Sequence, residues 1–200
     1  MSTEVDTLDL LDRAVNQLDA VVARISGDQE MLPTPCAEWD VRTLLGHVIG
    51  HSIPNSIVAA AGGTPDWQAS AADVQGDWAD ACARAAGELL ATWRAADMDR
   101  MVPSFGGQAP LRARADQQIA ELAVHTWDLA KATDQDAQLD AAVAEHALAW
   151  SRQMLKPEYR GAGQGFGPEV LVASDAPSYD QLAAWFGRNP AWQPGTEQPI

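Results

Sequence analysis

Residues 7–25, TLDLLDRAVNQLDAVVARI, carry the most regular pattern in the chain. Their apolar side chains recur at alternating intervals of three and four residues, the spacing of an amphipathic α-helix that buries one face. These side chains are Leu8, Leu11, Val15, Leu18, Val22 and Ile25. Because Gly27 follows the last of them closely, we expect the helix to end there. The stripe predicts a core formed by helices packed against one another.

The next two helices are predicted from their capping residues. Asp40 is a good N-cap, and the pattern after it continues to the paired glycines at 62–63, with a kink expected at Pro54 because proline removes one backbone hydrogen bond. The prolines within residues 28–39 exclude a helix from the preceding segment. Ser70 is expected to cap a third helix that extends to about Ala96.

The second half of the chain is predicted to be helical as well. Residues 97–112 hold two prolines and paired glycines, which predicts an extended loop or a short hairpin. Helices are expected at about 113–132 and 140–155, and Ser178–Gln181 has the spacing of a capping box that begins a short last helix. No segment alternates strongly enough to predict a sheet strand. The sequence therefore predicts an all-α fold, a four-helix bundle with additional C-terminal helices.

Composition excludes several classes of function. The 200 residues include 28 acidic and 13 basic side chains, a net charge of −15 that disfavours binding to nucleic acid or to an anionic membrane surface. No apolar run approaches the roughly 20 residues of a membrane helix, and the N-terminal sequence lacks the features of a signal peptide. Two cysteines do not make a disulfide framework. We therefore expect a cytoplasmic protein, as a monomer or homodimer.

The histidines supply the chemistry. Glu121 and His125 are four residues apart on the fourth predicted helix, so their side chains lie on one face, and His47 flanks the apolar stripe of the second helix in the same way. If these helices pack side by side, a carboxylate and two imidazoles meet at the edge of the core and could hold zinc or a neighbouring first-row metal. The spacing alone equally allows hydrogen-bonded or surface histidines.

Other candidate residues have competing interpretations. His51 is four residues from His47 and could share a metal with it, or it could line the helix flank. Cys36 could be a reactive thiol near a helix N-terminus, or a small packed residue. Cys82 and His146 lie in alanine-rich helical segments, which favours structural roles.

Two longer strings resemble a known family. TPCAEWDVRTLLGHVIG (34–50) and ELAVHTWDLAKATD (121–134) resemble the metal-binding domain of the mycothiol-dependent maleylpyruvate isomerase family, within the DinB/YfiT-like superfamily. Residues 165–192 resemble the ending of small single-domain members. The resemblance implies one DinB-like domain over residues 1–192, with residues 193–200 as a disordered tail.

The resemblance also implies a metal centre. His47, Glu121 and His125 match the positions that hold a divalent metal in this family, commonly zinc, with nickel or another first-row metal as alternatives. Characterised relatives bind a low-molecular-weight thiol, such as mycothiol, at the open metal position. The isomerase itself carries a further C-terminal domain, whereas only residues 133–200 follow the fourth predicted helix here, so its reaction does not carry over.

Three functions remain open from the sequence. The first is a thiol-dependent metalloenzyme, an isomerase or S-transferase that presents the thiolate to a small electrophile. In it, Asp128 could orient a ligand imidazole, and Arg42 and Arg112 could receive a carboxylate of the thiol or substrate. The other two are a non-catalytic metal-binding module and a protein-interaction bundle.

Overall fold

The computed structural model of the protein describes residues 6–37, 39–104, 107–161 and 166–194. Its longer helices are α1 (Thr7–Val22), α2 (Val41–His47), α3 (Ile53–Ala60), α4 (Trp78–Ala95), α5 (Arg112–Ala132), α6 (Ala141–Met154) and α7 (Ser178–Trp185). The shorter elements are the helical segments η1 (Gly27–Gln29), η2 (Val48–Ser52) and η3 (Pro157–Tyr159) and the antiparallel strands β1 (Met101–Ser104) and β2 (Gly107–Pro110). The prediction of a helical bundle with additional C-terminal helices is confirmed.

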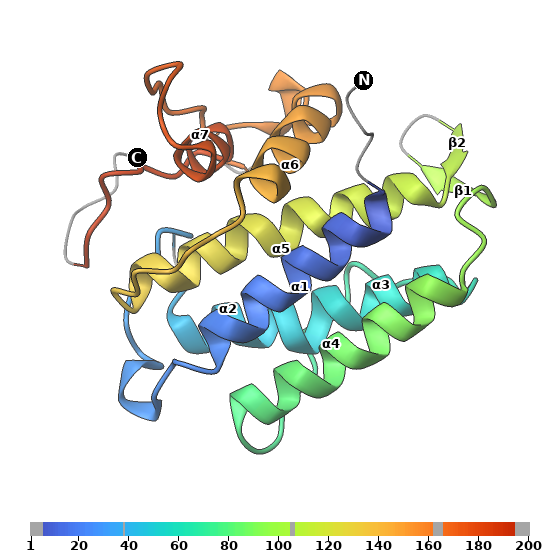
Figure 1. Ribbon diagram of the computed structural model, residues 1–200, viewed down its shortest axis with the longest axis horizontal. Helices are drawn as coiled ribbons and strands as arrows, with labels where there is room; N and C mark the ends of the chain where they lie inside the picture. The colour runs from blue at the N-terminus through green and yellow to red at the C-terminus, as the bar shows by residue number, and fades with distance from the viewer. Residues whose placement is uncertain (1–5, 38, 105–106, 162–165, 195–200) are drawn as a thin grey trace.

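Helix α5 lies at the centre of this arrangement (Figure 1). On one side it packs against α1 and the continuous rod formed by α2, η2 and α3, while α4 closes the bundle against α1 and α3. On its other side it packs against α6 and α7. Nearly every residue of α5 from Gln118 to Ala130 is buried as a result. Polar side chains on this stretch are therefore held in place by their surroundings.

The apolar stripe of α1 lies in the core, as its spacing predicts. Leu11 and Leu18 are fully buried, and Val15 and Val22 are nearly so. The helix ends at Val22, earlier than Gly27, which instead begins the segment η1. After this early end, the chain continues through η1 into the loop that carries Cys36 and the N-cap of α2.

The predicted kink at Pro54 takes the form of a widened helical turn in η2, just before the proline. Because Pro54 has no N–H group, it cannot bond the carbonyl of Gly50. That carbonyl instead accepts a hydrogen bond from the backbone N–H of Ala72, at 3.0 Å. A Cβ atom at Gly50 would lie 2.5 Å from the carbonyl oxygen of Ala72, so this close approach of two backbones requires glycine. The five-residue turn has π-helical bonding, with Ile53 N–H donating to the carbonyl of Val48.

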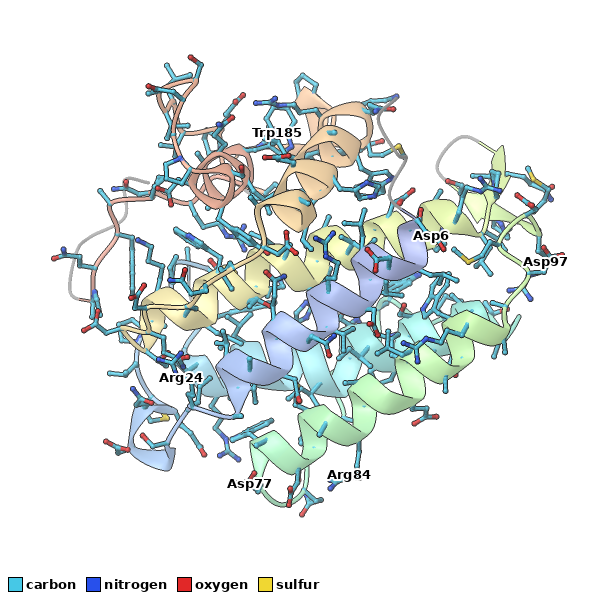
Figure 2. All side chains as sticks on the ribbon, viewed as in Figure 1. Asp6, Arg24, Asp77, Arg84, Asp97 and Trp185 are labelled. Carbon is cyan, nitrogen blue, oxygen red and sulfur yellow. The ribbon has the colours of Figure 1, made fainter. Side chains whose placement is uncertain are left out.

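The predicted start of the third helix at Ser70 is wrong. Helix α4 begins at Trp78, and its N-cap is Asp77, whose carboxylate accepts hydrogen bonds from the N–H groups of Ala79 and Asp80 at 2.9 and 3.2 Å. Figure 2 shows Asp77 at this end of α4. The residues before Asp77 form a loop, and the backbone hydrogen bond from Ala72 to Gly50 holds this loop beside η2.

Of two other local predictions, one is confirmed and one is wrong. The alternative of a short hairpin at residues 97–112 is confirmed by β1 and β2, which pair antiparallel from Met101 with Pro110 to Ser104 with Gly107. The capping box at Ser178 is wrong, because the N-cap of α7 is Pro177 and the Ser178 hydroxyl donates to Glu145 on α6 instead.

The C-terminal segment remains packed up to Trp192, which is buried. Most of the predicted tail, from residue 195 onward, lies outside the described residues. Within the described ranges, no helix is both long enough and apolar enough to cross a membrane.

Candidate metal centre

Two helices bring three potential metal ligands together. His47 is the last residue of α2, and Glu121 and His125 lie one turn apart on α5, which packs against α2. Glu121 Oε1 lies 2.6 Å from His47 Nε2 and 3.4 Å from His125 Nε2. One ligand atom from each residue falls within 4.8 Å of the others. The structure therefore brings together the three residues that the helical spacing selected.

A buried carboxylate fixes the orientation of one imidazole. His125 Nδ1 lies 3.0 Å from Asp128 Oδ2, one turn further along α5, and both side chains are buried. Because Nδ1 donates a hydrogen bond to this carboxylate, Nε2 is the nitrogen that faces Glu121 and His47, and it could bind a metal once its own proton is displaced. A carboxylate behind the imidazole is the usual partner of a metal-binding histidine.

Asp128 is held in turn by an arginine from the C-terminal segment. Arg188 donates from Nε to Asp128 Oδ1 at 3.3 Å and from Nη2 to Oδ2 at 3.1 Å. Its Nη1 donates to the carbonyl of Phe186 at 3.0 Å, so its position is fixed by the backbone that follows α7. Sequence analysis did not find Arg188, since 60 residues separate it from Asp128 and no periodicity connects them.

The electrostatics follow from this burial and pairing. Burial acts to raise the pKa of Glu121, but the neighbouring His125 and His47 rings hold it well below its ordinary value. Burial acts to lower the pKa of His125, whereas Glu121 and Asp128 raise it to about 9. Burial also acts to raise the pKa of Asp128, and the Arg188 guanidinium overcomes it and keeps that pKa low. Both carboxylates are thus ionised at neutral pH, as a metal centre requires.

Aromatic rings cover the imidazoles. The ring of Trp39 lies 4.7 Å from that of His47 and 6.0 Å from that of His125, between centroids. The His51 ring lies 5.7 Å from that of His47, and its Nδ1 atom faces the side-chain nitrogen of Asn55 at 3.4 Å. Among the described residues, the groups of three potential ligands do not include His51.

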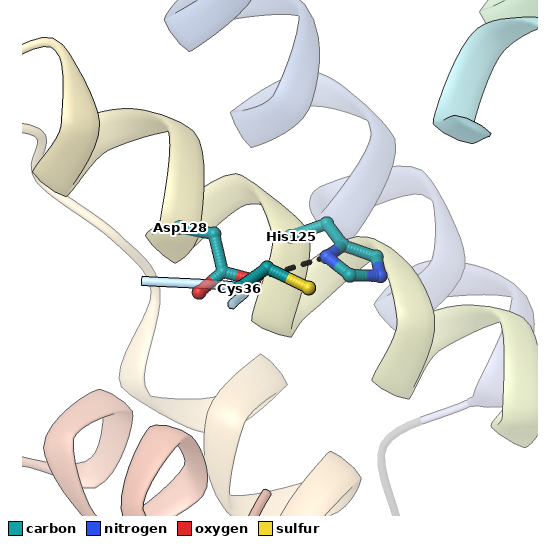
Figure 3. A group of neighbouring side chains, drawn as sticks. All are labelled: Cys36, His125 and Asp128. Carbon is teal, nitrogen blue, oxygen red and sulfur yellow. Dashed lines mark hydrogen bonds and ion pairs between the residues drawn. The ribbon is translucent and has the colours of Figure 1, made fainter. Parts of the chain in front are cut away.

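A second group of potential ligands shares His125. Cys36, His125 and Asp128 also bring one ligand atom each within 4.8 Å of one another. Figure 3 shows these three side chains together. In the metal-free protein burial raises the pKa of the Cys36 thiol to about 12, so a metal would have to displace its proton, and Asp128 is already paired with Arg188. Metal binding needs a thiolate. The chemistry of the donors therefore favours the group of His47, Glu121 and His125.

This donor set fits a divalent metal. Two imidazole nitrogens and one carboxylate oxygen are the ligands of many catalytic zinc sites, which keep a further position open. Ligands of a tetrahedral zinc ion lie roughly 3.4 Å apart, given metal–ligand distances near 2.1 Å. The 3.4 Å between His125 Nε2 and Glu121 Oε1 has this spacing. The shorter contact between Glu121 and His47 is an ordinary hydrogen bond that a metal would replace.

The two arginines expected to receive a carboxylate have partners within the protein. Arg42 pairs with Glu30 at 2.6 Å, and Arg112 pairs with Asp99. Each guanidinium is neutralised by a neighbouring side chain and is more than half exposed. His146 pairs with Asp116 at 2.8 Å, away from the three ligands.

A cavity adjoins the centre through Glu121. It lies between α5, α6 and the β1–β2 hairpin, and Glu121 lines it together with Arg114, Trp150 and Phe186. Glu121 thus contacts both histidines and borders a space that a small molecule could enter.

Comparisons with known proteins identify relatives of this chain. Residues 11–130 match the family described as the mycothiol maleylpyruvate isomerase N-terminal domain. The match covers more than half of the chain and includes His47, Glu121 and His125. The chain belongs to this family.

Two relatives match over almost their whole length. Two uncharacterized proteins of Mycobacterium tuberculosis, from strains CDC 1551 / Oshkosh and H37Rv, are each 32% identical to it over 188 residues. Each of these matches covers 92% of the chain and 98% of the relative.

The fold has a solved counterpart. The crystal structure of the mycothiol-dependent maleylpyruvate isomerase matches with a TM-score of 0.56 and 16% identity, over 96% of this chain and 81% of the isomerase chain. At that identity the match shows the fold. Part of the isomerase chain has no counterpart in this match. Arg188 lies outside residues 11–130, which match the mycothiol maleylpyruvate isomerase N-terminal domain family, yet it contacts Asp128 within them.

Proposed function

We propose that this protein binds a divalent metal through His47, Glu121 and His125, and that it uses a low-molecular-weight thiol of the mycothiol type in an isomerase or S-transferase reaction on a small electrophile. The observation that carries the proposal is the convergence of two imidazoles and one ionised carboxylate beside a cavity. Family membership supports the thiol, since the domain family is described by a mycothiol-dependent isomerase.

Zinc is the metal we propose first, with nickel or another first-row ion as alternatives. A zinc ion held by two histidines and a carboxylate keeps a position for a further ligand and lowers the pKa of a thiol that occupies it. The residues around it have separate tasks. Asp128 keeps the proton of His125 on Nδ1, and Arg188 keeps Asp128 ionised. Trp39 covers both imidazole rings and excludes water from one side.

Cobalt substitution tests this proposal without an activity assay. Protein purified without chelator should contain a divalent metal in stoichiometric amount by elemental analysis. After exchange to Co²⁺, addition of mycothiol or N-acetylcysteine should release one proton and produce a thiolate charge-transfer band in the near ultraviolet, since only the thiolate is a good ligand.

Two variants make the experiment specific. Glu121→Ala should lose the band, whereas Glu88→Ala, an exposed acid on α4, should keep it. Metal-replete protein that gives neither the band nor proton release would contradict the thiol-dependent function and would indicate a non-catalytic metal-binding module instead.

A further inference from the structure

The cavity beside the metal centre has the size of a small-molecule site. Its volume is about 340 Å³, within the range of ligand pockets. Most of its wall is apolar, formed by side chains such as Val102 on β1, Trp150 and Met154 on α6, and Phe166 and Phe186. An apolar wall of this kind favours a ligand with a hydrocarbon or aromatic body.

One face of α5 forms the polar side of the cavity. Arg114, Gln117 and Glu121 all line it, and their spacing of three and four residues places them in a row along the helix. The helix rises about 1.5 Å per residue, so Arg114 and Glu121 are roughly 10 Å apart along its axis. In the metal-free protein the cavity therefore has a basic end at Arg114 and an acidic end at Glu121.

Within the part of the chain that the structure describes, Arg114 has no carboxylate partner. Its Nη1 donates to Gln117 Oε1 and its Nη2 to the carbonyl of Pro103, both at 2.8 Å, and both acceptors are neutral. Among the ion pairs of the described residues, none includes Arg114, although the chain carries a net charge of −15. A guanidinium has five N–H donors, so donors remain for a ligand. Arg112, two residues earlier, differs because it is paired with Asp99 and does not line the cavity.

We propose that the cavity binds an apolar carboxylate, with its anionic group at Arg114 and its other end beside Glu121. In the metal-free protein the negative charge of Glu121 disfavours the reverse orientation, because it would place two carboxylates together. For the metal-loaded protein, the titration of the His47→Ala variant below decides between the two orientations. This inference rests on the proposed function for one point only, namely that the end beside Glu121 is the end that reacts. The substrate would then be an electrophile with an apolar body, anchored by a carboxylate remote from the reacting atoms.

A matched pair of ligands tests the proposal. Octanoate and 1-octanol have the same chain length and differ in charge, and their affinities can be compared by isothermal titration calorimetry on the metal-loaded protein. We expect octanoate to bind more tightly than octanol. Arg114→Gln should weaken octanoate binding by about tenfold or more and leave octanol unchanged, because a charge-assisted hydrogen bond is lost. Arg112→Gln, the matched control, should change neither affinity.

Further arms separate the alternatives. Repeating the titrations on His47→Ala protein tests whether the carboxylate binds the metal, and we expect octanoate affinity to persist there. Ala113→Leu narrows the cavity and should weaken both ligands, which tests the site even if Arg114→Gln folds poorly. The proposal would be overturned if wild-type protein bound octanol and octanoate equally tightly, or bound neither. It would also be overturned if His47→Ala lost octanoate binding while Arg114→Gln kept it, or if the two arginine variants changed octanoate affinity equally. Failure of thiol binding with these results intact would overturn the proposed function alone.

Discussion

His125 Nδ1 and Asp128 Oδ2 lie 3.0 Å apart, and the two residues are buried and one turn from each other on α5. This contact decides which nitrogen of His125 can bind a metal, because Nδ1 donates a hydrogen bond to the carboxylate whereas Nε2 faces Glu121. The orientation of His125, a proposed metal ligand, is thus set by a residue outside the proposed donor set.

Removal of either histidine ligand should remove the metal without unfolding the chain. His47→Ala and His125→Ala are expected to lose most bound metal, because one carboxylate and one imidazole hold a divalent ion weakly. The helical core remains in both variants, so we expect a stability loss of about 1–3 kcal/mol. Elemental analysis and circular dichroism measure the two effects together. Stoichiometric metal in either variant would show that the ligand assignment is wrong.

His51→Ala should keep its metal. The His51 ring lies 5.7 Å from that of His47, but its Nδ1 atom faces Asn55, and Glu121 and His125 complete the donor set without it. Metal affinity by competition with a chromophoric chelator should stay within about threefold of wild type. A loss as severe as that of His47→Ala would place His51 among the ligands.

Asp128→Asn should weaken metal binding and the fold together. Loss of the carboxylate behind His125 is expected to lower metal affinity by about 10–100-fold. It also leaves the buried Arg188 without its counter-charge, which costs about 3–5 kcal/mol in the free energy of unfolding. Chelator competition and urea denaturation measure these effects.

A similar carboxylate–histidine pair, between Asp116 on α5 and His146 on α6, supplies the control for that variant. Asp116 and His146 form a half-buried contact of 2.8 Å away from the centre. Asp116→Asn should therefore leave metal affinity unchanged and cost less than about 1 kcal/mol. Equal effects of the two substitutions would show that Asp128 has no special relation to the metal.

Metal affinity should rise with pH up to about 9. In the metal-free protein, Glu121 and Asp128 raise the pKa of His125 to about 9 against the effect of burial. Below that pH a metal must displace the proton on Nε2, so affinity is expected to fall about tenfold for each pH unit from 9 to 7. Zinc titrations at constant ionic strength with a competing chelator, over pH 6.5–9.5, measure this dependence. Constant affinity over this range would contradict a protonated His125 in the metal-free state.

Both cysteines should react slowly with alkylating reagents in the folded protein. Burial is the main cause that raises the pKa of Cys36 and of Cys82 to about 12. Iodoacetamide labelling at pH 8, followed by mass spectrometry, should be at least about a hundredfold slower than in urea-unfolded protein. Cys36→Ala and Cys82→Ala assign any labelled site. Labelling of Cys36 at the rate of a free thiol would restore the interpretation of a reactive cysteine.

The sequence predicts those features of the site that depend on local spacing. The stripe of α1 and the relation of Glu121 to His125 follow from helical periodicity, which is why both appear in the structure as expected. Arg188 could not be predicted, because its contact with Asp128 depends on how the segment after α7 packs against α5. No sequence pattern in either segment indicates that they pack together.

Errors in local prediction arose where two residues offered similar signals. Serine and aspartate are both favoured at N-caps, but Asp77 and not Ser70 caps α4, and the hydrogen bond from Ala72 to Gly50, invisible in the sequence, lies in the loop between them. Arg112 and Arg114 differ by two residues on one helix, yet the first pairs with Asp99 and the second lines the cavity. Only tertiary structure distinguishes such neighbours.

The widened turn of η2 has a consequence for how this site can change through evolution. A turn of five residues in place of the usual spacing acts like a one-residue insertion, which rotates the part of the helix before it by about 100° relative to the part after it. His47 precedes the turn and the core residue Ile53 follows it. The side-chain direction of His47 therefore depends on α2, whereas the core packing of Ile53 depends on α3. Mutations in α3 can change how the bundle packs while His47 keeps its orientation.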